Sequence, residues 1–126
     1  MINAKVIYNK LLNNEKITAL VNEDNIMSSW PDEDLENFPC LIFLDDNQGD
    51  GEYNDNRPSA SNCSVQIHIF SKKLEGYVST SEIAIKVAEV MHDDLWHGSQ
   101  NAEVSDPDPN CEHRVMRFSK SIFELI

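Results

Sequence analysis

Residues 63–96 constrain the fold most strongly, because their pattern predicts a strand, a turn and a capped helix in succession. Apolar and polar residues alternate over residues 64–70 (SVQIHIF), which is the period of a half-buried strand. Gly76 then interrupts the pattern, and Ser79 and Glu82 have the spacing of a capping box at a helix start. The segment is built to pack and no reactive group converges on it, which argues against an enzyme.

An apolar stripe with helical spacing follows this cap and predicts an amphipathic helix. Its members are Ile83, Ala84, Val87, Val90, Met91 and Leu95. Two shorter helices are expected earlier in the chain, over residues 3–12 and residues 15–21, where apolar residues recur at helical intervals. Residues 26–30 are expected to form a short extended piece, and the acidic residues 32–37 a loop.

Two further strands are predicted from the apolar pattern. Residues 40–44 (CLIFL) are continuously apolar, which predicts a strand that is buried on both faces and can pair with residues 64–70. Residues 112–123 alternate and predict a closing strand, whereas residues 45–61 and 98–110 are polar and predict long loops. The expected fold class is α+β, a small mainly antiparallel sheet packed against an N-terminal helix and one longer amphipathic helix, in the order α-α-β-β-α-β.

The length of 126 residues predicts one domain over residues 1–126, with a long polar loop at about 45–61. The cysteines are odd in number and far apart, which predicts buried thiols in a reducing cytoplasm rather than disulfides. They are Cys40, Cys63 and Cys111. No N-terminal signal peptide is expected, and no apolar run approaches the ~20 residues that span a bilayer, so no membrane partner is expected.

The formal net charge of −12 constrains the partners. Only 10 basic residues stand against 22 acidic ones, which argues against binding nucleic acid through its phosphates. One explanation of the acidic excess is solubility, because like-charged copies repel one another. The other is a surface along which DNA passes without binding. Composition alone leaves both explanations open.

Candidate metal and catalytic motifs fail on their spacing. The first, third, fifth and sixth positions of an EF-hand loop are matched by Asp46, Gln48, Asp50 and Gly51, but Arg57 stands at the twelfth, where a bidentate carboxylate is needed. The paired cysteines of a zinc site, the GxSxG elbow and the glycine-rich phosphate loops are all missing from the sequence. No catalytic residue, cofactor or metal is therefore expected.

Positive charge is concentrated near the end of the chain, at Arg114, Arg117 and Lys120. In an acidic protein these residues are candidate contacts for an acidic loop of a neighbouring copy. Ordinary solvation of a strand face explains them as well.

The order of these features resembles that of the small phage tail completion, or head–tail joining, proteins, which are related in fold to tail terminator proteins. The resemblance covers nearly the whole chain as a pattern. It is carried by Leu11-Leu12, residues 17–21, Phe38-Pro39-Cys40-Leu41-Ile42, residues 65–71, residues 79–95 and residues 113–118.

The resemblance implies a structural subunit without cofactor or catalytic residues. Such subunits form a closed ring, often hexameric, at the joint between the tail tube and the head connector of a virion. The implied partners are further copies of the chain, the tail tube protein and the connector protein. The implied location is the bacterial host cytoplasm during assembly and then the virion.

The long loop of this family tends to mediate contacts in the ring, and the matching positions here are residues 45–61. We therefore expect a monomer when free, whose loop becomes ordered on assembly. The expected subunit or partner contacts are Asp45, Asp46, Asp50, Glu52, Tyr53, Asp55 and Arg57, together with Arg114 and Arg117.

An alternative of a different class is a small acidic binding module or inhibitor that mimics DNA and acts on a basic protein. A ring that caps a tube in particle images supports the first hypothesis. A tight one-to-one complex with a basic DNA-binding protein supports the second.

Overall fold

The computed structural model describes residues 9, 14–28, 30–31, 37–45 and 60–123, with the backbone alone at residues 45, 60–63 and 121–123. The helix expected over residues 3–12 and the loop expected over residues 32–37 thus lie almost wholly outside the described residues. In chain order the elements are α2 (Glu15–Thr18), the 3-10 turn η1 (Glu23–Asn25), β1 (Ile26–Met27), β2 (Cys40–Asp45), β3 (Ala60–Lys72), α3 (Thr80–Asp93), β4 (His97–Val104) and β5 (Cys111–Phe123).

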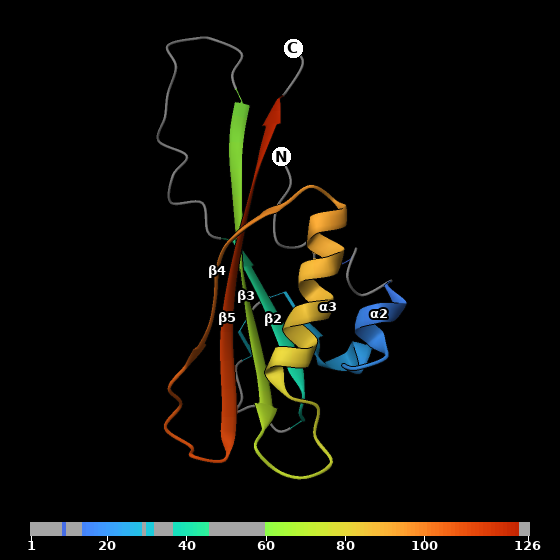
Figure 1. The fold of residues 1–126 in the computed structure, drawn as a ribbon, viewed down its shortest axis with the longest axis vertical. Coiled ribbons are helices and arrows are strands. Elements are labelled where there is room, and N and C mark those ends of the chain that lie inside the picture. The colour runs from blue at the N-terminus through green and yellow to red at the C-terminus, as the bar shows by residue number, and fades with distance from the viewer. Residues whose placement is uncertain (1–8, 10–13, 29, 32–36, 46–59, 124–126) are drawn as a thin grey trace.

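The strands form one five-stranded sheet with the order β1-β2-β3-β5-β4. The short β1 is parallel to β2, and the other three pairings are antiparallel, so the sheet is mixed but mainly antiparallel. The longest pairing joins β3 to β5 over their full length, from Ala60 opposite Phe123 to Lys72 opposite Cys111. In Figure 1, α3 lies along one face of the sheet and α2 lies beside α3. The expected α+β class is confirmed.

The main core lies between α3 and the sheet face that it covers. Val65, Ile67 and Ile69 of β3 project toward the helix, because alternate residues of a strand point to the same face. They meet the apolar stripe of α3, in which Ile83 and Val87 are fully buried. Each buried side chain of this size contributes about 1.5–3 kcal/mol, so this layer supplies much of the folding free energy.

The opposite face of the sheet is also buried, contrary to the half-buried strand expected over residues 64–70. His68 and Phe70, on this face of β3, are 9% and 6% exposed. Phe70 packs in a second cluster with Cys40, Ile42 and Cys111. Strand β2 therefore has buried residues on both of its faces, as its continuous apolar run predicts.

The start of α3 follows the sequence signals closely. Ser79 is the N-cap, and its Oγ accepts a hydrogen bond from the backbone N–H of Glu82 at 3.3 Å. Gly76 has a φ of +94°, a conformation that only glycine adopts without strain, so the turn before the helix requires this residue. The short helix expected over residues 15–21 is confirmed as α2, although its helical part ends at Thr18.

The region after α3 corrects two expectations. The polar loop expected over residues 98–110 is wrong for its first half, because His97–Val104 form the edge strand β4 against β5. Leu95 is not in the apolar stripe either, since α3 ends at Asp93 and the Leu95 side chain is 80% exposed. Trp96 takes its place and is 2% exposed.

Leu95 occupies the left-handed position of a C-terminal Schellman cap. Its φ is +67°, its N–H bonds the carbonyl of His92 at 2.9 Å, and the N–H of Trp96 bonds the carbonyl of Met91 at 3.0 Å. Glycine is the usual residue at this position, because a side chain there crowds the backbone.

No helix among the described residues is long and apolar enough to cross a membrane.

Replacing Leu95 by glycine is expected to stabilise the protein. The exchange removes the left-handed strain and loses little burial, a net gain of about 1 kcal/mol, or roughly 3–5 °C in Tm for a chain of this size. Thermal unfolding followed by circular dichroism measures the change. Leu95→Ala is the control, because alanine keeps the strain; equal Tm values for the glycine and alanine variants would contradict the prediction.

Candidate interaction surfaces

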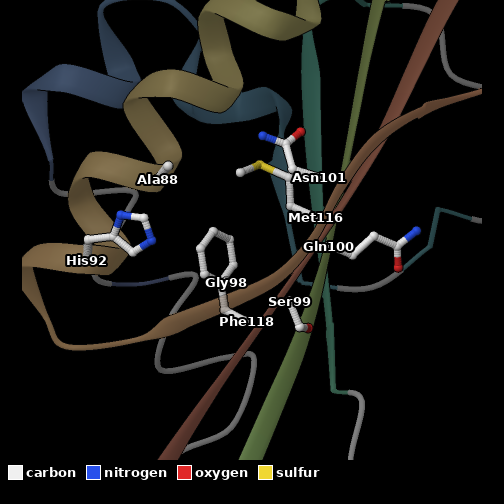
Figure 2. Close-up of a pocket in the computed structure, with 8 residues that line it drawn as sticks. All are labelled: Ala88, His92, Gly98, Ser99, Gln100, Asn101, Met116 and Phe118. Atoms are coloured by element: carbon white, nitrogen blue, oxygen red, sulfur yellow. The ribbon is translucent and has the colours of Figure 1, made fainter.

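An open groove lies between α3 and the edge strand β4 (Figure 2), with a volume of about 320 Å³. Ala88 and His92 line it from α3, and Met116 and Phe118 line it from β5. Its other wall is the β4 segment 98–101. In Figure 2 the imidazole of His92 points toward the ring of Phe118, and the two ring centroids are 6.1 Å apart in an edge-on arrangement.

Gly98 allows β4 to pass close over this groove. A Cβ atom at Gly98 would lie 3.4 Å from Cε1 of Phe118 and 3.7 Å from Nε2 of His92. These are contact distances, so any larger side chain here would fill the space between strand and helix. The groove was not predicted from the sequence, because the segment that forms its wall was expected to be a loop.

Arg114 lies on the helix-covered face and holds the start of α3 to the sheet. Its Nη1 donates to Oδ1 of Asn101 at 3.0 Å, and its Nε donates to Oγ1 of Thr80 at 3.4 Å. Glu112 completes the network, because its Oε1 accepts hydrogen bonds from both N–H and Oγ1 of Thr80, each at 3.0 Å. A carboxylate at a helix N-terminus also interacts favourably with the helix dipole. The network therefore joins β4, β5 and α3.

Arg117 projects to the opposite face of the sheet, because it stands three positions after Arg114 along β5, an odd offset that reverses the face. Lys120 lies at the C-terminal end of α3. Its Nζ donates to the carbonyl of Asp94 at 2.7 Å and lies 3.7 Å from the Asp94 carboxylate. The structure thus separates the three cationic residues that the sequence places together, and two of them secure the two ends of α3.

The remaining predicted contacts lie almost entirely outside the described residues. Residues 46–59, which include Asp46, Asp50, Glu52, Tyr53, Asp55 and Arg57, belong to this part of the chain, and so does the EF-hand-like sequence. Asp45 is described through its backbone as the last residue of β2, paired with Val65. Within the described ranges, no three His, Cys, Asp or Glu side chains gather closely enough to hold a metal ion.

A chain of polar side chains crosses the opposite face of the sheet. His68 Nε2 lies 2.7 Å from Oε1 of Gln66, and His68 Nδ1 lies 2.8 Å from Nε2 of His113. Because the amide oxygen can only accept, His68 donates from Nε2, and its Nδ1 accepts from His113. The rings of Trp30 and Phe70 flank the pair, with centroids 4.9 Å from His68 and 4.1 Å from His113.

This arrangement favours uncharged histidines. The pKa of His68 is lowered from 6.5 to about 4, chiefly by burial and to a smaller extent by the nearby His113 and Arg117. Burial also lowers the pKa of His113, against an opposing effect of Asp106. A proton on Nδ1 of His68 would replace an acceptor by a second donor, so that Nε2 of His113 would have to accept instead of donate.

The cysteines behave as buried apolar residues where their side chains are described. Cys40 and Cys111 are free thiols, 1% and 8% exposed. Burial raises the pKa of Cys40 to about 12, with a smaller contribution from Cys111, so this thiol stays protonated. The side chain of Cys63 lies outside the described residues.

The buried histidine is expected to make the protein less stable in acid. The pKa of His68 is 6.5 when unfolded and about 4 when folded, so the unfolded chain binds more protons between these values and stability falls as pH falls through this window. The loss at pH 5 is about 2 kcal/mol. Urea unfolding at pH 7 and at pH 5 measures it.

Two histidine variants make this measurement specific. His68→Gln is expected to reduce the difference in unfolding free energy between the two pH values, because the titrating group is gone. His97→Gln removes an exposed histidine of β4 and is expected to keep the difference of the parent protein. An unchanged difference in His68→Gln would show that other groups cause the acid sensitivity.

Comparison with known proteins gives one family and one fold. A family model described as "Protein of unknown function (DUF806)" matches residues 4–123. No curated protein matches the chain significantly. Among solved structures, a chain from one titled "Virion of native gene transfer agent (GTA) particle" aligns with 94% of this chain and 92% of its own length, with a TM-score of 0.64 and 11% identity. At this identity the likeness establishes a shared fold.

Proposed function

The chain belongs to the DUF806 family, and we propose that it is a structural subunit of a phage virion or a virion-like particle. The observation that carries the proposal is the extent of the fold match to a chain of the gene transfer agent virion. The alignment covers 92% of that chain as well as 94% of this one, so the likeness involves both folds from end to end and not a common motif. A structural role needs shape and contact surfaces and no reaction centre.

We propose further that the subunit forms a ring at the joint between head and tail. The element order supports this location, because it resembles that of tail completion and head–tail joining proteins. The charge supports it as well, since DNA passes through this joint and a net charge of −12 per copy would keep the channel wall from binding its phosphates. The partners would be further copies of the chain, the tail tube protein and the head connector.

Contacts within such a ring are proposed for the acidic loop at residues 45–61 and for Arg117, which lies on the sheet face opposite α3. Arg114 is proposed as a contact as well, and within the subunit it donates hydrogen bonds to Thr80 and Asn101. Hydrogen exchange of residues 45–61 tests the loop contact. Equal protection in the free chain and in particles would count against it.

Localisation in particles tests the proposal directly. Particles from cells that produce the chain with a short C-terminal tag would be labelled with antibody and imaged by electron microscopy. Label at the head–tail junction is the expected result, and deletion of the gene should leave heads and tails unjoined. Label elsewhere on the particle would contradict the junction, and particles without the chain would contradict the structural role.

Self-association is expected to strengthen with salt. Every copy carries a charge of −12, so copies repel one another, and shortening the Debye length from about 10 Å at 0.1 M to about 3 Å at 1 M screens this repulsion. Sedimentation velocity of the purified chain across these concentrations measures the effect. Association that weakens with salt would instead indicate contacts dominated by pairs of opposite charge.

A further inference from the structure

The exposed part of α3 is divided into two stripes of different character. Glu82, Lys86, Glu89 and Asp93 form the charged stripe, and Ser81, Ile85, Ala88 and His92 form the uncharged stripe. At 100° per residue the two stripes are centred about 100° apart around the helix. The charged stripe faces α2, since Lys16 of that helix lies 3.4 Å from Glu89. The uncharged stripe borders the α3–β4 groove, which Ala88 and His92 line.

The edge strand β4 continues this uncharged surface. Residues 95–102 (LWHGSQNA) carry no Asp, Glu, Lys or Arg, although a quarter of the whole chain is charged. Residues 97–103 are all exposed, and among the described residues no strand pairs with the outer edge of β4. Glu103 is the next charged residue, and it lies directly across from Arg114 in the register.

An open strand edge has unpaired backbone groups that can accept another strand. In an antiparallel sheet every second residue of β4 directs its N–H and C=O away from β5. A bulge between Gly98 and Gln100 interrupts the pairing, but residues 100–104 pair regularly with β5. This length accommodates a partner strand of about five residues, the common length in proteins. The opposite edge strand, β1, has only two residues.

We propose that the β4 edge is the site at which a second copy of this chain adds an extended strand and continues the sheet from one subunit to the next. This inference rests on the proposed structural role. Alternate side chains of the added strand would lie on the side of α3, beside the groove formed by Ala88, His92, Met116 and Phe118. The backbone pairing would supply affinity, and the groove would select the side chains that enter it.

The distribution of charge is the reason for assigning a second copy to this site. Two copies with a net charge of −12 each repel one another over most orientations. They approach at least cost where neither the helix stripe nor residues 95–102 contain an Asp, Glu, Lys or Arg. Ile85 on the uncharged stripe is 58% exposed in the free chain, and an apolar residue at this place gains by being covered.

Charge variants at Ile85 test the site. Ile85→Glu and Ile85→Lys are both expected to weaken self-association at least tenfold, because either charge would be desolvated without a partner. If overall repulsion alone mattered, Ile85→Lys would strengthen association by reducing the net charge. Sedimentation equilibrium of the full chain at high salt measures the association, and circular dichroism confirms that the variants fold.

Leu74 provides the matched control. It lies in the turn between β3 and α3, is 51% exposed, and so allows the same two exchanges outside the uncharged surface. Leu74→Glu and Leu74→Lys are expected to leave self-association within about twofold of the parent chain. Equal weakening at Leu74 and Ile85, or strengthening in Ile85→Lys, would overturn the proposal.

Hydrogen exchange at β4 tests the strand addition itself. Comparison of the dilute monomer with the associated chain is expected to show new protection of alternate amides in residues 100–104, since the other amides already bond to β5. Association without new protection there would overturn the proposal, and so would a parent chain that stays monomeric at high salt. Both failures leave the proposed structural role standing, because the presence of the chain in particles decides that role.

Discussion

The pairing of β3 with β5 is the interaction on which the rest of the structure depends. The two strands lie far apart in the sequence and run antiparallel over 13 residues each, from Ala60 to Lys72 and from Cys111 to Phe123. They form the centre of the sheet, with β2 on one side and β4 on the other. Their register sets which residues meet α3 and which meet the opposite face, because a shift by one residue would exchange the two faces.

Both ends of helix α3 are fixed to this central pair by side chains of β5, which lies far from the start of the helix in the sequence. At its start, Glu112 and Arg114 of β5 bond to Thr80. At its end, Lys120 of the same strand bonds to the carbonyl of Asp94. The charged residues of β5 on this side are thus used within the subunit. Residues 97–102 of β4 and the uncharged stripe of α3 carry no Asp, Glu, Lys or Arg, and this is the surface that we propose for association between copies.

The two faces of the sheet differ in the chemistry that they bury. The helix-covered face has an apolar core of aliphatic and aromatic side chains. The opposite face buries His68 against His113 and Gln66 between aromatic rings, so its packing depends on both histidines staying neutral. Burial lowers the pKa of both histidines and so favours that state at neutral pH. The predicted acid sensitivity and the proposed self-association therefore belong to different parts of the molecule.

The sequence by itself determined the elements whose signals are local. The alternation of residues 64–70, the apolar run of residues 40–44, the Ser79 cap and the glycine at position 76 each act within a few residues, and the structure has a strand, helix start or turn at each of them. The α+β class follows from these elements. Tertiary structure alone decided that residues 97–104 form a strand, because their polar sequence has no strand pattern and the pairing with β5 holds them extended. It also placed Leu95 outside the core and brought His68 to His113, since both outcomes depend on where the helix ends and on the register of strands that are distant in sequence.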